Sequence, residues 1–247
     1  FKAIALIFIV LTVWWITIFF RSLKEGIEND MFTLSYCILA LLGGIAGWVF
    51  SKKWGGFKSI LGKAIMMFSL GLLAQFLGQI LYNYYIYVKG IEVPYPSIGD
   101  AVFFASVLFY IVGAYLLAKV SGIKLSIKSL FGKLQAIAIP IIILLISYLV
   151  LLKGYEVDWS NKLIIFLDFG FPIGQAIFVS IAILALMISK DILGGMMRKP
   201  IMLLIFALIF QYLSDFTFSY QVGTGTWYVG GINDYLFCVS YFLMAAS

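Results

Sequence analysis

The sequence predicts an all-α integral membrane protein with eight transmembrane helices. Of its 247 residues, 64% are hydrophobic and only 11% are charged, which lies outside the usual composition of soluble globular domains. The apolar residues form long continuous runs, whereas the strands of a membrane β-barrel alternate in polarity. A helix needs roughly 20 apolar residues to cross the hydrocarbon core. The expected helices span residues 2–20, 31–50, 62–88, 101–119, 134–152, 163–188, 201–221 and 234–247.

The loops between these runs alternate in charge, and the alternation predicts the orientation of the chain. Short loops rich in Lys and Arg are retained on the cytoplasmic side of a membrane. Eleven of the 17 basic residues fall in three such loops: Lys52, Lys53, Lys58 and Lys63; Lys119, Lys124, Lys128 and Lys133; Lys190, Arg198 and Lys199. The loops between them carry acids, at Glu25, Glu28, Asp30, Glu92, Glu156 and Asp158. We therefore expect a multi-pass protein of the cell membrane with both termini in the cytoplasm.

The basic charge balance favours lipid over nucleic acid as a partner. The sequence pI is about 9.2, but the basic residues are spread over short inner loops. Anionic lipid headgroups account for such a distribution better than nucleic acid does. Between the two halves, residues 121–133 place apolar and basic side chains on separate faces of a helix: Ile123, Ile127, Leu130 and Phe131 against Lys124 and Lys128. We interpret this segment as an amphipathic cytoplasmic linker on the inner membrane surface.

The third helix and its outer loop resemble the seventh helix and its outer loop. The matching residues follow in the same order: Gln75, Gln79, Tyr84, Asp100, Phe103 and Ser106 correspond to Gln211, Asp215, Tyr220, Asp234, Phe237 and Ser240. We interpret the match as a duplication, with one four-helix repeat over residues 1–120 and another over residues 134–247. Because four is an even number, both repeats run in the same sense, and their pseudo-two-fold axis is expected along the membrane normal.

Polar residues inside the apolar runs form the candidate binding site. Such residues are costly in hydrocarbon, so they face a bundle interior or a water-filled cavity. Gln75 and Gln79 lie one turn apart, and Gln211 and Asp215 repeat that spacing on another helix. One interpretation is a seam of hydrogen bonds between helices. The other is an outward-facing cavity for a small molecule or a cation, lined by Gln75, Gln79, Tyr84, Asp168, Gln211, Asp215 and Tyr220.

Among these residues, Asp168 and Asp215 are the strongest indication of a binding site. No Lys, Arg or His lies in the outer half of any expected helix to neutralise them directly. A carboxylate in that position takes up a proton, opens to water, binds a cation or bonds to neighbouring backbone. Tyr84 and Tyr220 belong either to a vestibule that holds a cation through ring contacts or to the aromatic belt of the membrane interface.

Asp100 and Asp234 are predicted to cap helices at the outer loops. They directly precede apolar runs, in the motifs PSIGD and GGIND. A carboxylate there accepts hydrogen bonds from free backbone amides, and its charge suits the helix dipole. Pro94 and Pro96 stiffen the first of these loops.

The sequence lacks the residues that several kinds of chemistry require. The chain has no His, which removes His-ligated haem, imidazole metal sites and His-based general-base catalysis. Cys37 and Cys238 fall inside separate apolar runs, so neither a thiolate cluster nor a disulfide is expected. No phosphate-binding loop, nucleophile elbow or protein-kinase motif set is present. We therefore expect no cofactor, no metal site and no enzymatic activity.

Several motifs resemble a known kind of membrane module. They are YPSIGDAVFF, LDFGFPIGQ, and SDFTFSY followed by WYVGGINDYLFCVSYFL. Together they are similar to the membrane sensory-input module found ahead of bacterial diguanylate cyclase and histidine kinase domains. In that family a second Asp usually follows the Pro of the sixth helix, where this chain has Gly174 and Gln175. The resemblance implies a multi-helix sensory unit.

The leading hypothesis is therefore a polytopic sensor, in which outer loops and a polar cavity respond to a stimulus and helix rearrangement passes it inward. The last apolar run is short and the chain does not begin with Met, so we expect residues upstream and a cytoplasmic output domain after Ser247. A proton- or cation-coupled transporter that uses Asp168 and Asp215 is the first alternative. A non-catalytic structural subunit of a membrane complex, bound to a partner subunit, is the second.

Overall fold

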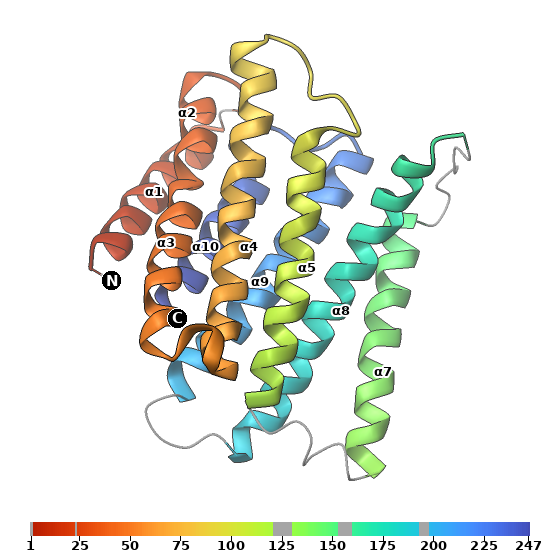
Figure 1. Cartoon of the computed structure of the whole chain (residues 1–247). Coiled ribbons are helices and arrows are strands. Elements are labelled where there is room, and N and C mark those ends of the chain that lie inside the picture. The colour runs from red at the N-terminus through yellow and green to blue at the C-terminus, as the bar shows by residue number, and fades with distance from the viewer. Residues whose placement is uncertain (1, 23, 121–129, 153–159, 193–197) are drawn as a thin grey trace.

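The computed structural model describes residues 2–22, 24–120, 130–152, 160–192 and 198–247, and the described residues form helices without any strand (Figure 1). The α-helices are α1 (Lys2–Phe20), α2 (Ile27–Tyr36), α3 (Ile38–Lys53), α4 (Ile60–Asn83), α5 (Ile98–Val120), α7 (Leu130–Ser147), α8 (Lys162–Ile192), α9 (Arg198–Gly223) and α10 (Ile232–Ala246). A 3-10 turn, η1 (Gly56–Lys58), joins α3 to α4. Two π-helical turns, η2 (Tyr84–Val88) and η3 (Tyr148–Leu152), extend α4 and α7. The all-α class is confirmed.

Within the described ranges, seven helical segments are long and apolar enough to cross a membrane. They are Lys2–Phe20, Ile27–Lys53, Ile60–Val88, Ile98–Val120, Lys133–Leu151, Lys162–Met187 and Lys199–Gly223. The eighth, α10, has 15 residues. At 1.5 Å per residue it is about 23 Å long, which is less than the roughly 30 Å of the hydrocarbon core. The chain is thus a multi-pass helical membrane protein, with an apolar helix at each expected position.

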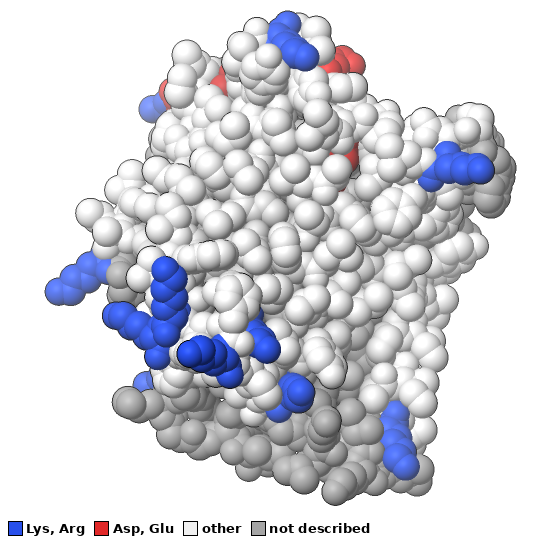
Figure 2. All heavy atoms as spheres, viewed as in Figure 1, with Lys and Arg blue, Asp and Glu red and all other residues white. Residues whose placement is uncertain are grey.

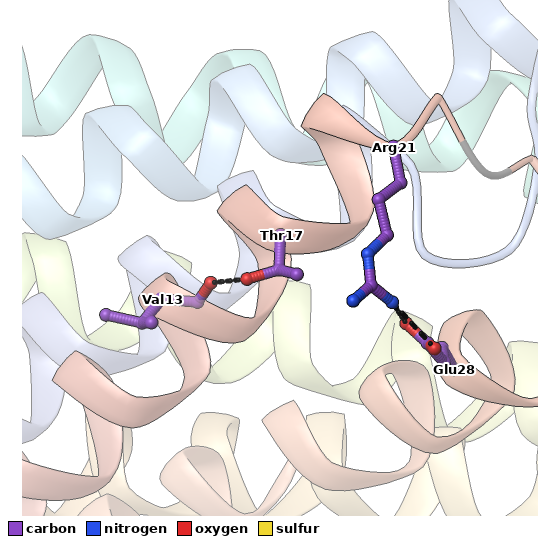
Figure 3. A network of polar contacts seen from close by, with 4 residues as sticks. All are labelled: Val13, Thr17, Arg21 and Glu28. Carbon is purple, nitrogen blue, oxygen red and sulfur yellow. Dashed lines mark hydrogen bonds and ion pairs between the residues drawn. The ribbon is translucent and has the colours of Figure 1, made fainter.

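The second expected helix differs from the structure at its outer end. Expected at residues 31–50, it begins at Ile27 and is divided at Cys37 into α2 and α3. Glu28 and Asp30 lie in the first turn of α2, where negative charge interacts favourably with the helix dipole. Arg21, just past the end of α1, also pairs with Glu28 at 3.1 Å (Figure 3). Because Glu28 and Asp30 are charged, hydropathy alone does not include them in the expected helix. In the structure their charges stabilise one more turn at its start.

The expected linker falls mostly outside the described part of the chain. Residues 121–129 lie outside the described residues, and residues 130–133 form the beginning of α7. The amphipathic cytoplasmic linker therefore stays a prediction.

The helices pack as a closed ring. α3 packs against α4, α4 against α5, and α5 against α8; α8 then packs against α9, α9 against α10, and α10 back against α3. α1 lies against α10 and α2, and α7 lies outermost against α8 (Figure 1). Tyr110, Phe178 and Leu208 are among the large side chains of this ring that are fully buried.

Charged side chains separate between the two ends of the bundle. In the view of Figure 2, carboxylates appear only toward the upper end, where α2 begins and α4 ends, and most basic side chains lie toward the lower end. We call these the acidic end and the lysine end. At the lysine end, the turn from α3 to α4 carries four exposed basic side chains: Lys52, Lys53, Lys58 and Lys63.

Glycines let α4 and α5 approach each other closely. A Cβ atom on Gly71 would lie 2.3 Å from the Tyr110 ring, and one on Gly113 would lie 2.8 Å from the Phe68 ring. Small residues are common at contacts between membrane helices, because surrounding lipid supplies no hydrophobic drive and packing must hold the helices together.

Gly71→Ala should destabilise the protein by about 1–3 kcal/mol, because the added methyl group overpacks the α4–α5 contact. Gly223→Ala is the matched control, since a Cβ atom there meets nothing within 4 Å. Thermal unfolding in detergent measures both variants. Identical unfolding midpoints for Gly71→Ala and the wild type would contradict the close approach of these helices.

Candidate functional site

A cluster of polar side chains lies inside the bundle, between the two halves of the chain. It comprises Tyr36 of α2, Gln75 and Gln79 of α4, and Asp234 and Tyr241 of α10, and we call it the central polar cluster. Gln79 is half-buried, and the other four side chains are at most 4% exposed. Because α10 lies far from α2 and α4 in sequence, only the folded bundle brings these residues together.

Gln75 is held by hydrogen bonds from both sides. The Tyr241 hydroxyl donates to Gln75 Oε1 at 3.0 Å. Gln75 Nε2 in turn donates to Ser106 Oγ on α5 at 2.8 Å. A buried amide is thereby satisfied within the protein, as an environment without water requires.

Tyr36 connects this amide region to the acidic end. Its ring stacks on Tyr241 with centroids 6.1 Å apart, and its hydroxyl lies 3.5 Å from Gln79 Oε1. The same side chain lies within electrostatic range of the Asp234 carboxylate. Asp234 Oδ2 also accepts from the Thr33 hydroxyl at 2.7 Å. A polar path therefore runs from the start of α10 to Gln79, near the end of α4.

The corresponding residues of the second half form a similar set. Ser240 Oγ of α10 donates to Gln211 Oε1 of α9 at 2.8 Å, and Gln211 Nε2 donates to Asp215 Oδ1 at 3.1 Å. Gln211 is fully buried and Asp215 is half-buried. The aligned Gln and Ser positions of the two halves are thus hydrogen-bonded to each other in both halves.

Two buried tyrosines lie near Asp215. Its carboxyl lies within electrostatic range of Tyr110 on α5 and of Tyr241 on α10. The Tyr110 hydroxyl is buried and has no hydrogen-bond partner among the described residues. Polar groups of α5, α9 and α10 therefore lie within electrostatic range of one another inside the bundle.

The remaining predicted site residues have other neighbours, toward the acidic end. Asp168 on α8 accepts a hydrogen bond from Tyr95 in the loop before α5. Tyr84 is 45% exposed, and Lys89 Nζ lies 5.4 Å from its ring centroid. Tyr220 is 48% exposed. Two of these three side chains are therefore surface groups.

Asp100 and Asp234 bond to backbone amides from within the first turn of their helices. Asp100 Oδ2 accepts from Ser97 N at 2.7 Å, and Ser97 Oγ accepts from Asp100 N at 3.3 Å. This reciprocal pair is the arrangement of a capping box, with Ser97 at the cap position. Asp234 Oδ2 accepts from Gly230 N at 2.8 Å. Each acid is the third residue of its helix instead of the residue ahead of it.

Two recesses open at the acidic end, beside the loop between α9 and α10. One, of about 340 Å³, lies against the end of α1, and the other, of about 400 Å³, lies against the start of α2. Neither is bordered by Gln79, Asp168 or Asp215. These recesses and the expected polar cavity therefore occupy different places.

The central polar cluster is built of amides, hydroxyls and carboxylates. Such groups exchange hydrogen bonds and protons, and they bind neutral or cationic partners. Within the described part of the chain, no group of three or more His, Cys, Asp and Glu residues could hold a metal ion. A rotation of one helix relative to its neighbours would exchange the hydrogen-bond partners of these groups.

Sequence reasoning does not single out Tyr36, Tyr110 or Tyr241 as site residues. A Tyr in an apolar run looks the same whether it packs against lipid or donates to a buried amide. Their roles depend on which helix lies opposite, and no local signal in the sequence carries that information.

No protein-family model matches the chain, and neither the curated proteins nor the solved structures give a match. The resemblance to sensory-input modules rests on the outer motifs alone. The function must therefore be argued from the geometry of the bundle.

Tyr241→Phe should lower the free energy of unfolding by about 0.6–2 kcal/mol, which is the range for hydrogen bonds between membrane helices. The substitution removes the donor to Gln75 and keeps the ring. Tyr235→Phe is a suitable control, because its hydroxyl reaches only Thr12 at 3.4 Å. In thermal unfolding, the midpoint of Tyr241→Phe should be lower than that of Tyr235→Phe. Equal midpoints would show that the bond to Gln75 contributes no stability.

Proposed function

We propose that the chain is a sensory input module of the cell membrane, which passes a stimulus from its acidic end to a cytoplasmic output. The observation that carries the proposal is the polar path from the loop before α10, through Asp234 and then through Thr33 and Tyr36 of α2, to Gln79. A displacement of that loop acts on Asp234, which is bonded into the bundle interior. The motifs YPSIGD and WYVGGIND, which resemble those of sensory-input modules, support the same function.

The energetics of the central polar cluster suit a switch. Signalling through packed helices needs two arrangements of similar energy. Hydrogen bonds between membrane helices contribute about 0.6 kcal/mol on average, so the exchange of one for another changes the energy little. Tyr110 Oη and Asn83 Nδ2 are buried and have no partner among the described residues, so they are available as alternative partners. A small rotation of α4 or α10 would then re-pair Gln75 or Gln79.

The proposal includes two parallel repeats with both termini in the cytoplasm. The hydrogen bond from Gln75 to Ser106 and that between Gln211 and Ser240 support the duplication. The contact of α5 with α8 also has its counterpart in the contact of α10 with α3. With an axis along the membrane normal, the lysine end faces the cytoplasm and the acidic end faces outward.

The lysine end is proposed to bind anionic lipid headgroups. The turn between α3 and α4 exposes Trp54 and Phe57, at 38% and 65%, and aromatic rings of this kind favour the membrane interface. The four lysines around the turn have no ion pair with any described residue. An anionic inner leaflet would supply their counter-charges.

The orientation is tested by labelling with a thiol reagent that does not cross membranes. In a background where the buried Cys37 and Cys238 are replaced by Ala, Glu92→Cys should react in intact cells, because it lies at the acidic end. Lys58→Cys should react only after lysis. The opposite pattern would place the lysine end outside.

A reporter fusion tests the sensory function. Residue Ser247 is joined to a diguanylate cyclase domain, and cyclic dinucleotide is measured in cells. Gln75→Leu removes an interaction of about 0.6–1.4 kcal/mol, which should shift a two-state equilibrium about three- to tenfold and change basal output accordingly. Gln135→Leu, half-buried on α7 and outside the cluster, is the control. Unchanged output from Gln75→Leu at a normal membrane level would contradict the proposal.

Ion-coupled transport is the alternative function, and the half-buried Asp215 among uncharged interior groups is the observation that favours it. Ion-dependent uptake into liposomes that Asp215→Asn abolishes, with folding preserved, would select the transporter over the sensor.

A further inference from the structure

The loop between α9 and α10 is clamped onto the end of α1 and the start of α2. Asn29 Nδ2 donates to the Val229 carbonyl at 2.9 Å, and Trp15 Nε1 donates to the Gly231 carbonyl at 3.3 Å. Gly230, between them, has a φ of 73°, and a Cβ atom there would lie 3.0 Å from Asn29. A larger side chain would strain this close approach, so the loop has a defined place against α2.

The clamped loop forms a wall of the two recesses at the acidic end, which share Lys24 and Tyr228 as lining residues. The recess of about 340 Å³ is lined mainly by apolar side chains of α1: Trp15, Ile18, Phe19 and Phe20. The recess of about 400 Å³ is lined by polar groups near the start of α2, together with Trp227: Glu25, Asn29 and Asp30. An apolar lobe therefore adjoins a charged lobe, and each has the volume of a small-molecule site.

The composition of the charged lobe favours a cation. Glu25 and Asp30 bring two negative charges, and Lys24 brings one positive charge. Trp227 and Tyr228 line the same lobe, and the faces of such rings attract cations. Asp30 already lies at the positive end of the α2 dipole, so Glu25 and the two aromatic rings are the groups that would attract a positive head group.

A neighbouring contact holds one acid of this lobe, Asp30, in place. Asp30 Oδ1 accepts from the Tyr87 hydroxyl at 2.8 Å, which ties the start of α2 to the end of α4. Arg21 is already paired with Glu28 (Figure 3), so the guanidinium is engaged on that side of the turn. Within the described residues, that pair is the sole ion pair, and Glu25 and Asp30 have no cationic side chain bound to them.

We infer that this two-lobed recess binds a small amphiphile, with its alkyl group in the apolar lobe and an ammonium head group in the charged lobe. Phe19 and Phe20 are 53% and 81% exposed at the rim, so the ligand can enter from the outer membrane interface. The consequence for signalling rests on the proposed function: a bound molecule presses on the clamped loop, which leads directly to Asp234.

Isothermal titration of the purified chain in dodecyl maltoside micelles, which carry no charge and no ammonium group, tests the site. The probes are hexyltrimethylammonium, hexyl sulfate and tetramethylammonium, which separate the contribution of the head charge from that of the chain. We expect saturable binding of hexyltrimethylammonium, at least about tenfold tighter than that of either other probe. Glu25→Gln combined with Asp30→Asn should weaken it by about tenfold or more. Glu92→Gln, an exposed acid at the same end, should leave it unchanged.

Glu25→Gln alone provides a second variant if the double variant unfolds, because the Glu25 side chain is exposed and its loss disturbs no packing. Equal binding of the sulfate and the ammonium probes, or uptake that does not saturate and ignores both variants, would overturn the inference. If the ammonium probe does not bind but Gln75→Leu still changes the basal output of the reporter, only the proposed ligand class is rejected. If the ammonium probe binds specifically but Gln75→Leu does not change the reporter output, the sensory function is rejected and the binding site in the two-lobed recess is kept.

Discussion

The interior of this bundle depends on the satisfaction of its buried amides. Gln75 and Gln211 lie at 4% and 0% exposure inside a protein whose surroundings offer no water, so each needs partners on a neighbouring helix. Ser106 supplies one partner to Gln75, and Ser240 supplies one to Gln211. These short contacts require α5 to pack directly on α4, and α10 on α9. The relative rotation of each helix pair follows from its amide.

Close helix approach makes those bonds geometrically accessible. Gly71 and Gly113 remove side-chain bulk where α4 crosses α5, so the aromatic rings of the facing helix fit into the space. In lipid, where apolar side chains gain nothing by leaving solvent, such packing and a few interhelical hydrogen bonds are the main sources of association. The peripheral helices α1 and α7 contribute less to the interior and present apolar faces outward.

The two ends of the molecule connect to this interior in different ways. At the acidic end, Asp234 bonds both to the loop before α10 and to Thr33 of α2, so the loop cannot shift without disturbing buried contacts. At the lysine end, the α3–α4 turn presents exposed lysines and rings that suit contact with headgroups. One end of the bundle is therefore hydrogen-bonded to its core, whereas the other presents a charged and aromatic surface.

The sequence by itself determined the all-α class, the positions of the eight helices and the separation of charge, because hydropathy and loop charge are local properties. It also marked Gln75 and Gln211 as interior residues, since an amide in an apolar run has to face protein or water. Only the tertiary structure decided that Tyr241 bonds to Gln75 and that Tyr95 bonds to Asp168. It alone placed the recesses beside α1 and α2. Those outcomes depend on which distant segments meet across the bundle, and the periodicity of a single helix carries no information about its neighbour.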